Sequence, residues 1–159
     1  AVLGDVLSTG QSSRLYQKLV REKQAAVQAN AGVMERRGPS LFVATLMVTP
    51  GKDPADVEKM FYEEVERLKS ETVTDAEMEK VRMSVRRGEV EQLEGTLYRA
   101  QALGENAVFY NDPDVINTSS NKIRSVTKED IQKVARTYLI ESNRTVVVTT
   151  PKPRAGGVQ

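Results

Sequence analysis

The feature that most limits what this chain can fold into is a change of hydrophobic period near residue 25. Before it, apolar residues recur at helical spacing after a Gly-Gln break: Leu15, Leu19 and Val20, with Arg14, Lys18, Arg21 and Lys23 on the solvent side. After it, apolar residues alternate with others from Val27 to Met34, which is a strand pattern. A basic helix, which Ser12 or Ser13 would cap, therefore leads directly into a strand. Arg21 lies at the junction.

The predicted strand, residues 25–35, has a partner close by in the sequence. A second apolar run, residues 40–49, follows the polar turn at residues 36–39. Two strands joined by a short turn with Gly and Pro predict an antiparallel hairpin. Because the second run is apolar on both faces, we expect it to be a central, well-covered strand.

The segments that follow begin with recognisable helix signals. Asp53 and Pro54 open an amphipathic helix that continues to about Ser70, and its acidic residues, Glu64 included, are assigned to the solvent-facing side. A capping box from Thr74 to Glu77 opens a long helix that runs toward Pro113. The apolar spacing in that helix drifts, so we expect a bend near Gly88.

The last third of the chain is predicted to contain two more helices and a strand. The helices are a short one at Val115 to Val126 and an amphipathic one after the capping signal at Thr127 to Asp130. The β-branched run from Arg144 to Thr150 is the predicted final strand. Residues 1–150 are therefore expected to form one α+β domain, a two-layer sandwich whose antiparallel or mixed sheet has helices mainly on one face. Residues 151–159, rich in Pro and Gly, are assigned to a linker or disordered tail.

The residue types that are missing exclude whole classes of chemistry. The chain has no Cys and no His, so it offers neither a disulfide framework nor an imidazole for a triad. Catalytic zinc sites usually include His, and a site built from carboxylates alone is rare. We therefore expect no catalytic residue, no metal site and no cofactor in this chain. We also expect the isolated chain to bind no zinc and to cleave no peptide.

The charge balance argues against two kinds of partner. The chain has 23 Lys and Arg against 22 Asp and Glu, a formal net charge of +1, so neither sign dominates. No basic stripe with interleaved aromatic residues indicates a nucleic-acid surface. No apolar run is long enough to span a bilayer. We expect neither nucleic acid nor a membrane as a partner.

The stretch Ser12-Ser13-Arg14-Leu15-Tyr16, followed by Arg21-Glu22-Lys23 and a strand, resembles a known family. It is similar to the C-terminal half-domain of the pitrilysin/insulinase zinc metallopeptidases, the inverzincins. It also resembles the mitochondrial processing peptidases and the core proteins of the cytochrome bc1 complex. The phrase from Val126 to Ile131 is typical of the same family, in which it introduces the last helix of a half-domain. The resemblance covers nearly the whole chain.

The resemblance implies roles for two residues. In many members an Arg at the position of Arg21 works with a Tyr seven residues later, and the pair binds substrate backbone near the scissile bond. Here the later residue is Gln28, whose amide can form hydrogen bonds but lacks the reach of a phenol. Arg21 and Gln28 are therefore the candidate substrate-binding residues. The competing interpretation of Arg21 is a cation that interacts with the dipole at a helix C-terminus.

The leading hypothesis is the non-zinc C-terminal part of a zinc metallopeptidase, a chamber wall that helps to hold an extended peptide substrate. The H-x-x-E-H motif that binds zinc and activates water would come from an N-terminal half or a partner subunit. The alternative is a catalytically inactive structural or interaction subunit of the same fold, like the bc1 core proteins. A third hypothesis is an autonomous domain that binds peptides or nucleic acids.

The family resemblance also implies something about the N-terminus and about association. Half-domains of this family usually open with a strand, whereas this chain starts in a predicted helix from Ala1 to Leu7. We therefore expect a truncated N-terminus and a sheet that another chain completes. An unpaired sheet edge favours self-association, so a homo-oligomer is also expected. The family points to the bacterial periplasm as the leading compartment.

Overall fold

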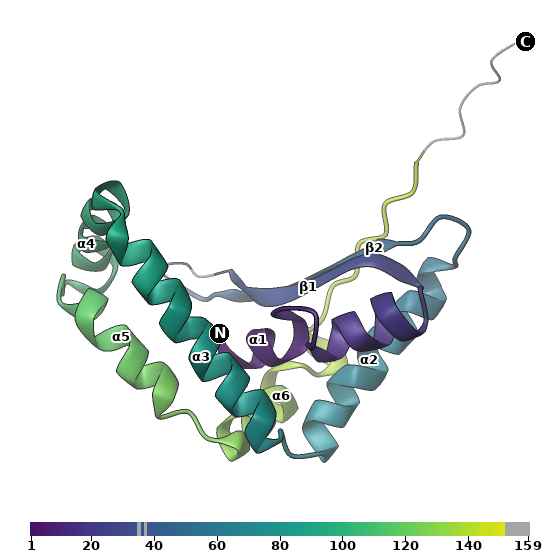
Figure 1. The fold of residues 1–159 in the computed structure, drawn as a ribbon. Coiled ribbons are helices and arrows are strands. Elements are labelled where there is room, and N and C mark those ends of the chain that lie inside the picture. Colours follow the sequence, from purple (N-terminus) through teal and green to yellow (C-terminus); the bar gives the residue numbers. More distant parts are fainter. Residues whose placement is uncertain (35, 37, 152–159) are drawn as a thin grey trace, which may run out of the picture.

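A hairpin of two antiparallel strands lies over a layer of helices in this computed structural model, which describes residues 1–34, 36 and 38–151 (Figure 1). This arrangement confirms the predicted α+β class, with helices against one face of the sheet. The elements in chain order are α1 (Val2–Ser8), η1 (Tyr16–Glu22), β1 (Ala26–Met34), β2 (Leu41–Val48), α2 (Pro54–Ser70), α3 (Asp75–Glu94), α4 (Thr96–Tyr110), α5 (Val115–Arg124), α6 (Lys128–Tyr138) and η2 (Glu141–Asn143).

The predicted hairpin is confirmed, and its pairing assigns each side chain to a face. The side chains of Ala29 and of its partner Leu46 pack toward the helices. Because successive side chains alternate, the neighbouring pairs lie on the opposite side. We call that side the open face: Gln28, Asn30, Gly32 and Met34 of β1, with Leu41, Val43, Thr45 and Met47 of β2.

One expectation about β2 is wrong. This strand is not covered on both faces by the described residues, since Leu41 is 51% exposed and Met47 is 57% exposed. An apolar run indicates a strand that can be buried on both sides, but it does not supply a second layer. Here α1, η1 and α2 cover one face of the hairpin, and the open face lies on the other side.

The helix that carries the Ser-Ser-Arg motif differs in form from the prediction. Its turns from Tyr16 to Glu22 are π-helical, and the N–H of Lys23 donates to the carbonyl of Lys18 five residues back. The predicted cap, in which a serine side chain accepts from a backbone N–H at the helix start, is wrong. The backbone carbonyl of Ser13 accepts from the N–H of Gln17, but its buried hydroxyl finds no hydrogen-bond partner in the described part of the chain.

The core lies between the covered face of the hairpin and the helices beneath it. The apolar residues predicted for η1 and α2 are buried, except for Val20 and Met60, which are partly buried. Residues of α1, α3 and α6 complete the cluster. The side chains with no exposed surface are Leu7, Leu15, Leu19, Leu68 and Ala135. Burying a side chain of this size contributes about 1.5–3 kcal/mol, so this cluster anchors η1 against β1.

The helix starts after β2 are confirmed, with one correction. Asp53 accepts from the N–H of Ala55, and Pro54 occupies the first turn of α2. Thr74 and Glu77 satisfy each other's backbone donors at the start of α3, as a capping box should. Glu64, however, is only 2% exposed and does not belong to the solvent-facing side of α2.

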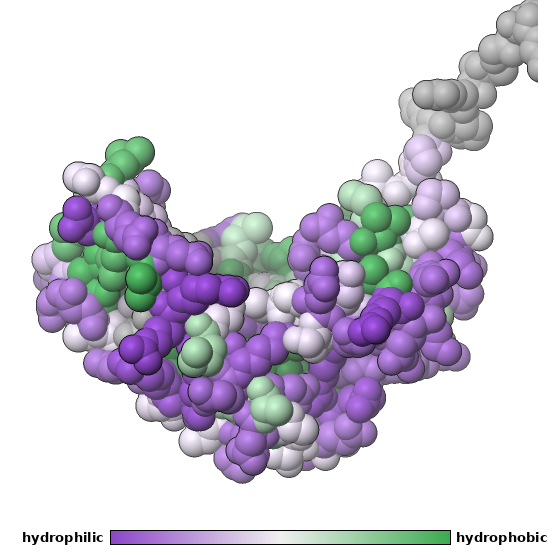
Figure 2. Space-filling model, in the orientation of Figure 1, coloured by the Kyte–Doolittle hydropathy of each residue, from purple (hydrophilic) through white to green (hydrophobic). Residues whose placement is uncertain are grey.

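The long predicted helix is two helices, and the break lies later than expected. α3 runs through Gly88 and ends at Glu94, and α4 begins after Gly95, whose backbone is extended (φ −79°, ψ 121°). α4 packs on α3 and α5 but buries none of its residues, and Figure 2 shows apolar side chains gathered over this end of the molecule.

The prediction at the C-terminal end is half right. α6 begins with the predicted capping box of Thr127 and Asp130. The predicted final strand at Arg144–Thr150 is wrong, because no described strand pairs with it. β-branched residues favour an extended chain, but a strand also needs a hydrogen-bonding neighbour. The predicted tail beyond Pro151 lies outside the described residues, as do Glu35 and Arg37 of the predicted hairpin.

No helix in the described ranges is both long enough and apolar enough to cross a membrane.

Candidate functional site

The two predicted site residues lie on neighbouring elements but are not joined to each other. Arg21 is exposed in the last turn of η1, which Leu15 and Leu19 anchor in the core. The chain then turns at Gln24, which has a positive φ of 49°, and enters β1. Gln28 is exposed on the open face. Within the described residues, neither the Arg21 guanidinium nor the Gln28 amide has a side-chain hydrogen bond or an ion pair.

A bulge in β1 helps to aim Gln28. The regular pairing shifts between Ala26 and Gln28, so Val27 is an extra residue opposite β2. Bulges of this kind re-aim the side chains beside them and often occur at functional sites. Asn30 lies on the same face two residues further on and is also exposed. Sequence reasoning missed Asn30, although its spacing of two from Gln28 was visible in the strand pattern.

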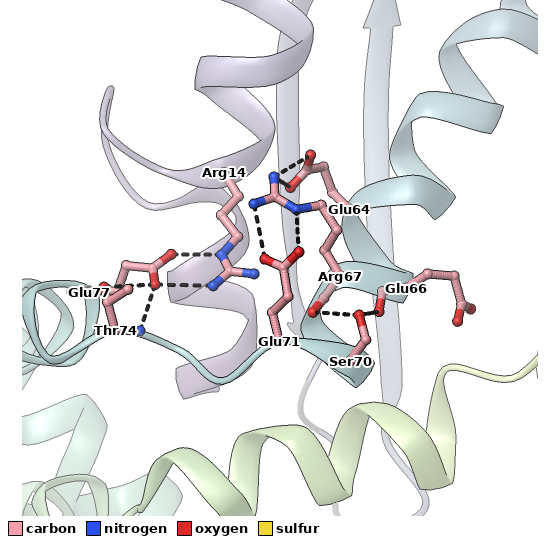
Figure 3. Close-up of polar contacts among 8 residues, drawn as sticks. All are labelled: Arg14, Glu64, Glu66, Arg67, Ser70, Glu71, Thr74 and Glu77. Carbon is pink, nitrogen blue, oxygen red and sulfur yellow. Dashed lines mark hydrogen bonds and ion pairs between the residues drawn. The ribbon is translucent and has the colours of Figure 1, made fainter.

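The Arg of the Ser-Ser-Arg motif, Arg14, forms a structural ion pair. The prediction that Arg14 faces solvent is wrong: its side chain is 11% exposed and forms a two-pronged pair with Glu77. Nε lies 2.6 Å from Oε1 of Glu77, and Nη2 lies 3.0 Å from Oε2 (Figure 3). Because Glu77 also caps α3 through Thr74, the pair ties the start of the motif helix to the start of α3.

The same contacts shift the acidity of Glu77. Burial by itself would raise the pKa of the Glu77 carboxyl, but hydrogen bonds from Arg14 and from the backbone and hydroxyl of Thr74 outweigh it and lower this pKa to about 2. The carboxylate is therefore charged at neutral pH and holds the Arg14 guanidinium in place.

A second charged cluster lies at the end of α2. Arg67 donates to both oxygens of the buried Glu64 and also pairs with Glu71 (Figure 3). The hydrogen bond from Arg67 lowers the pKa of Glu71. The burial of Glu64 could not be predicted from its spacing of three residues to Arg67, because such pairs are common on solvated helices. In this cluster Arg67 neutralises the buried carboxylate of Glu64, so we assign the cluster a structural role and not a ligand-binding one.

A shallow depression of about 560 Å³ lies between η1 and α2, lined by residues that include Lys18, Tyr62 and Arg67. Arg144 stacks over the ring of Tyr62 at 4.3 Å, near the same place. Neither Arg21 nor Gln28 lines this depression. The candidate residues therefore belong to an open surface and not to a pocket.

The part of the chain that the structure describes contains no candidate metal site. No three His, Cys, Asp or Glu side chains there come together in a way that could hold a metal ion. Carboxylates that might have converged, such as Glu64, Glu71 and Glu77, are instead paired with arginines. The candidate residues Arg21, Gln28 and Asn30 offer a charge and hydrogen-bonding groups.

Comparison with known proteins finds relatives that are much longer than this chain. It is 25% identical over 149 residues to the zinc protease PqqE of Helicobacter pylori, covering 94% of this chain and 33% of that protein. The solved structure of a protease from H. pylori matches with a TM-score of 0.81 and 24% identity, over 89% of this chain and 34% of the other. The chain thus spans about a third of the length of these relatives.

An isolated domain gives a match that covers most of both chains. The inactive peptidase domain of a candidate zinc protease from Bordetella parapertussis matches with a TM-score of 0.81 and 24% identity, over 97% of this chain and 83% of the other. A profile described as the Peptidase M16 inactive domain matches residues 1–85, which is more than half of the 159 residues. The chain therefore belongs to the inactive, C-terminal domain family of the M16 zinc peptidases, the pitrilysin/insulinase group that its Ser-Ser-Arg motif resembles.

Proposed function

We propose that this chain is the non-catalytic part of a zinc metallopeptidase and that its open face, together with Arg21, is a wall along which an extended peptide is held. The chain is an inactive domain, so zinc and the chemistry of cleavage belong to the active half. That half is the partner implied for this chain. The observation that carries the peptide-binding proposal is an exposed cation beside a strand with two exposed amides, all three without a described partner.

The chemistry of these groups suits a polypeptide backbone. A guanidinium is a fixed fork of donors, so Arg21 can hold a peptide carbonyl with a charge-assisted hydrogen bond. The amides of Gln28 and Asn30 each donate and accept, and can therefore bind both a carbonyl and an N–H of an extended chain. Apolar neighbours on the same face, Val43 and Met47, offer contacts to peptide side chains without demanding a particular sequence.

Replacing Arg21 by Ala in the whole protease tests this proposal. We expect kcat/KM on a peptide substrate to fall roughly 10- to 150-fold, the equivalent of one charge-assisted hydrogen bond of about 1.5–3 kcal/mol. Zinc content and melting temperature should barely change, since an exposed charge at a helix end contributes only about 0.3–1 kcal/mol. Gln28→Tyr restores the pair usual in the family and should hold or raise activity.

Lys23→Ala is the matched control, because Lys23 is an exposed cation two residues away in the same turn. It should leave kcat/KM within about twofold if the effect of Arg21 depends on its position and not on overall charge. A loss of stability in Arg21→Ala with unchanged activity per folded molecule would instead make Arg21 a structural helix-end cation.

A second candidate function is a scaffold without a role in peptide binding, and α4 favours it. None of the residues of α4 is buried, and Leu97 is 82% exposed, which suits a surface for another subunit. This function predicts that substitutions at Arg21 and Gln28 leave peptide cleavage unchanged.

A further inference from the structure

The two strands of the hairpin differ from the rest of the chain because neither contains a charged residue. The nine residues of β1 and the eight of β2 include no Asp, Glu, Lys or Arg, although these types make up 28% of the chain. On the covered face burial explains this composition, since an unpaired charge in a core is costly. The open face is different, because most of its side chains are exposed and a solvated sheet face ordinarily carries charges. Its composition is therefore that of a surface that contacts an uncharged ligand.

The side chains on the open face suit contacts with many different uncharged groups. Met34 is 50% exposed, and Met47 lies opposite Gln28. Methionine side chains are flexible and polarizable, and surfaces that bind many sequences use them often. In the middle of the face, Thr45 lies opposite Asn30, and both are exposed. These residues offer apolar contacts and neutral hydrogen bonds, but none of them offers an opposite charge.

We infer that the open face selects extended peptides whose side chains toward it are uncharged, with little preference among uncharged types. This inference rests on the proposed function, in which a peptide lies along this face. A charged side chain laid against the face loses part of its hydration and meets no opposite charge among the eight residues, whereas an uncharged side chain loses little. Because successive side chains of an extended peptide point to opposite sides, only every second position of the peptide is subject to this selection.

Moving a single Lys through an otherwise uncharged peptide substrate tests for this pattern in the whole protease. We expect kcat/KM to fall about tenfold at every second position along the part of the peptide that contacts the face. At the positions between, which point away from the face, kcat/KM should stay within about threefold of the uncharged peptide. A loss that does not alternate, or a gain at the positions toward the face, would overturn the inference.

A charge introduced at Thr45 shows whether the loss arises at the open face and not in the active half. Thr45→Glu supplies the missing opposite charge in the middle of the face, so it should remove most of the loss caused by Lys at one position of the peptide. Thr45→Lys should increase the loss at that same position. Thr45→Gln is the matched control, because Gln has the length of Glu without its charge, and it should leave the loss caused by Lys as it was. Thr45 is exposed, so all three variants should fold, and their melting temperatures check this.

The results separate this inference from the proposed function. If Arg21→Ala lowers kcat/KM but Thr45→Glu and Thr45→Lys leave the loss caused by Lys unchanged, the chain binds peptide without selecting against charge, and the inference is overturned alone. If Arg21→Ala and the charged variants at Thr45 all leave cleavage unchanged, the proposed function fails together with the inference. Opposite shifts from Thr45→Glu and Thr45→Lys at one peptide position are the result that the inference predicts.

Discussion

Replacing Arg14 by Met should lower the free energy of unfolding by about 3 kcal/mol, one of the two largest effects expected for a single substitution here. The substitution removes both hydrogen bonds to Glu77 and leaves its carboxylate partly buried beside an apolar side chain. Breaking a buried pair is more costly than an exposed one, and Arg14 is only 11% exposed. Denaturant unfolding of the two proteins measures the difference.

The pH dependence identifies the cause of this loss. Glu77 has a folded-state pKa of about 2 against an ordinary value of 4.5. A depressed carboxyl pKa adds stability that is present above pH 4.5 and disappears as the pH falls toward 2. The gap between the native protein and Arg14→Met should therefore shrink over that window. Arg87→Met, which disrupts an exposed pair with Glu91, should change the unfolding free energy by less than about 1 kcal/mol.

Replacing Gly4 by Ala should cost about 3 kcal/mol, at the upper end of the range for overpacked cores. The new methyl would lie 2.9 Å from the carbonyl oxygen of Ala31 and 2.9 Å from the Cα of Gly32. Both atoms are backbone, so no side chain can rotate away, and α1 must move off β1. Thermal unfolding measures the loss.

Gly32→Ala is the matched control, because it changes the other glycine at the same contact. A methyl there meets no described atom within 4 Å, since it projects from the open face. We expect this variant to be neutral or stabilised by up to about 1 kcal/mol through a less flexible unfolded chain. Equal destabilisation by the two substitutions would show that α1 does not approach β1 this closely.

Local patterns predicted most of the elements correctly, because their causes are local. The period change near residue 25 fixed β1, and the capping residues Asp53, Thr74 and Thr127 each mark a helix start that the structure confirms. A cap satisfies orphan backbone donors within one turn, so three or four residues contain all the information it needs.

The errors concern contacts between distant residues. Arg14 looked solvated from its place on a basic helix, but its partner Glu77 is 63 residues away. The prediction of a final strand was wrong for the same reason. Residues 144–150 have the composition of a strand, but no described strand pairs with them. Arg21 and Gln28 are candidates only through the family resemblance. Nothing in their own residue types distinguishes an exposed binding residue from an ordinary surface residue.

We propose that this chain contributes peptide binding to chemistry performed by an active half. The most direct measurement mixes the purified chain with the separately purified zinc-bearing half of the same protease and follows cleavage of an extended peptide. We predict that the chain alone holds no stoichiometric zinc and cleaves nothing. Adding the chain should raise kcat/KM of the active half by about tenfold or more. Adding a chain with Arg21→Ala should give a much smaller increase. An active half that is equally fast without the chain would contradict the claim.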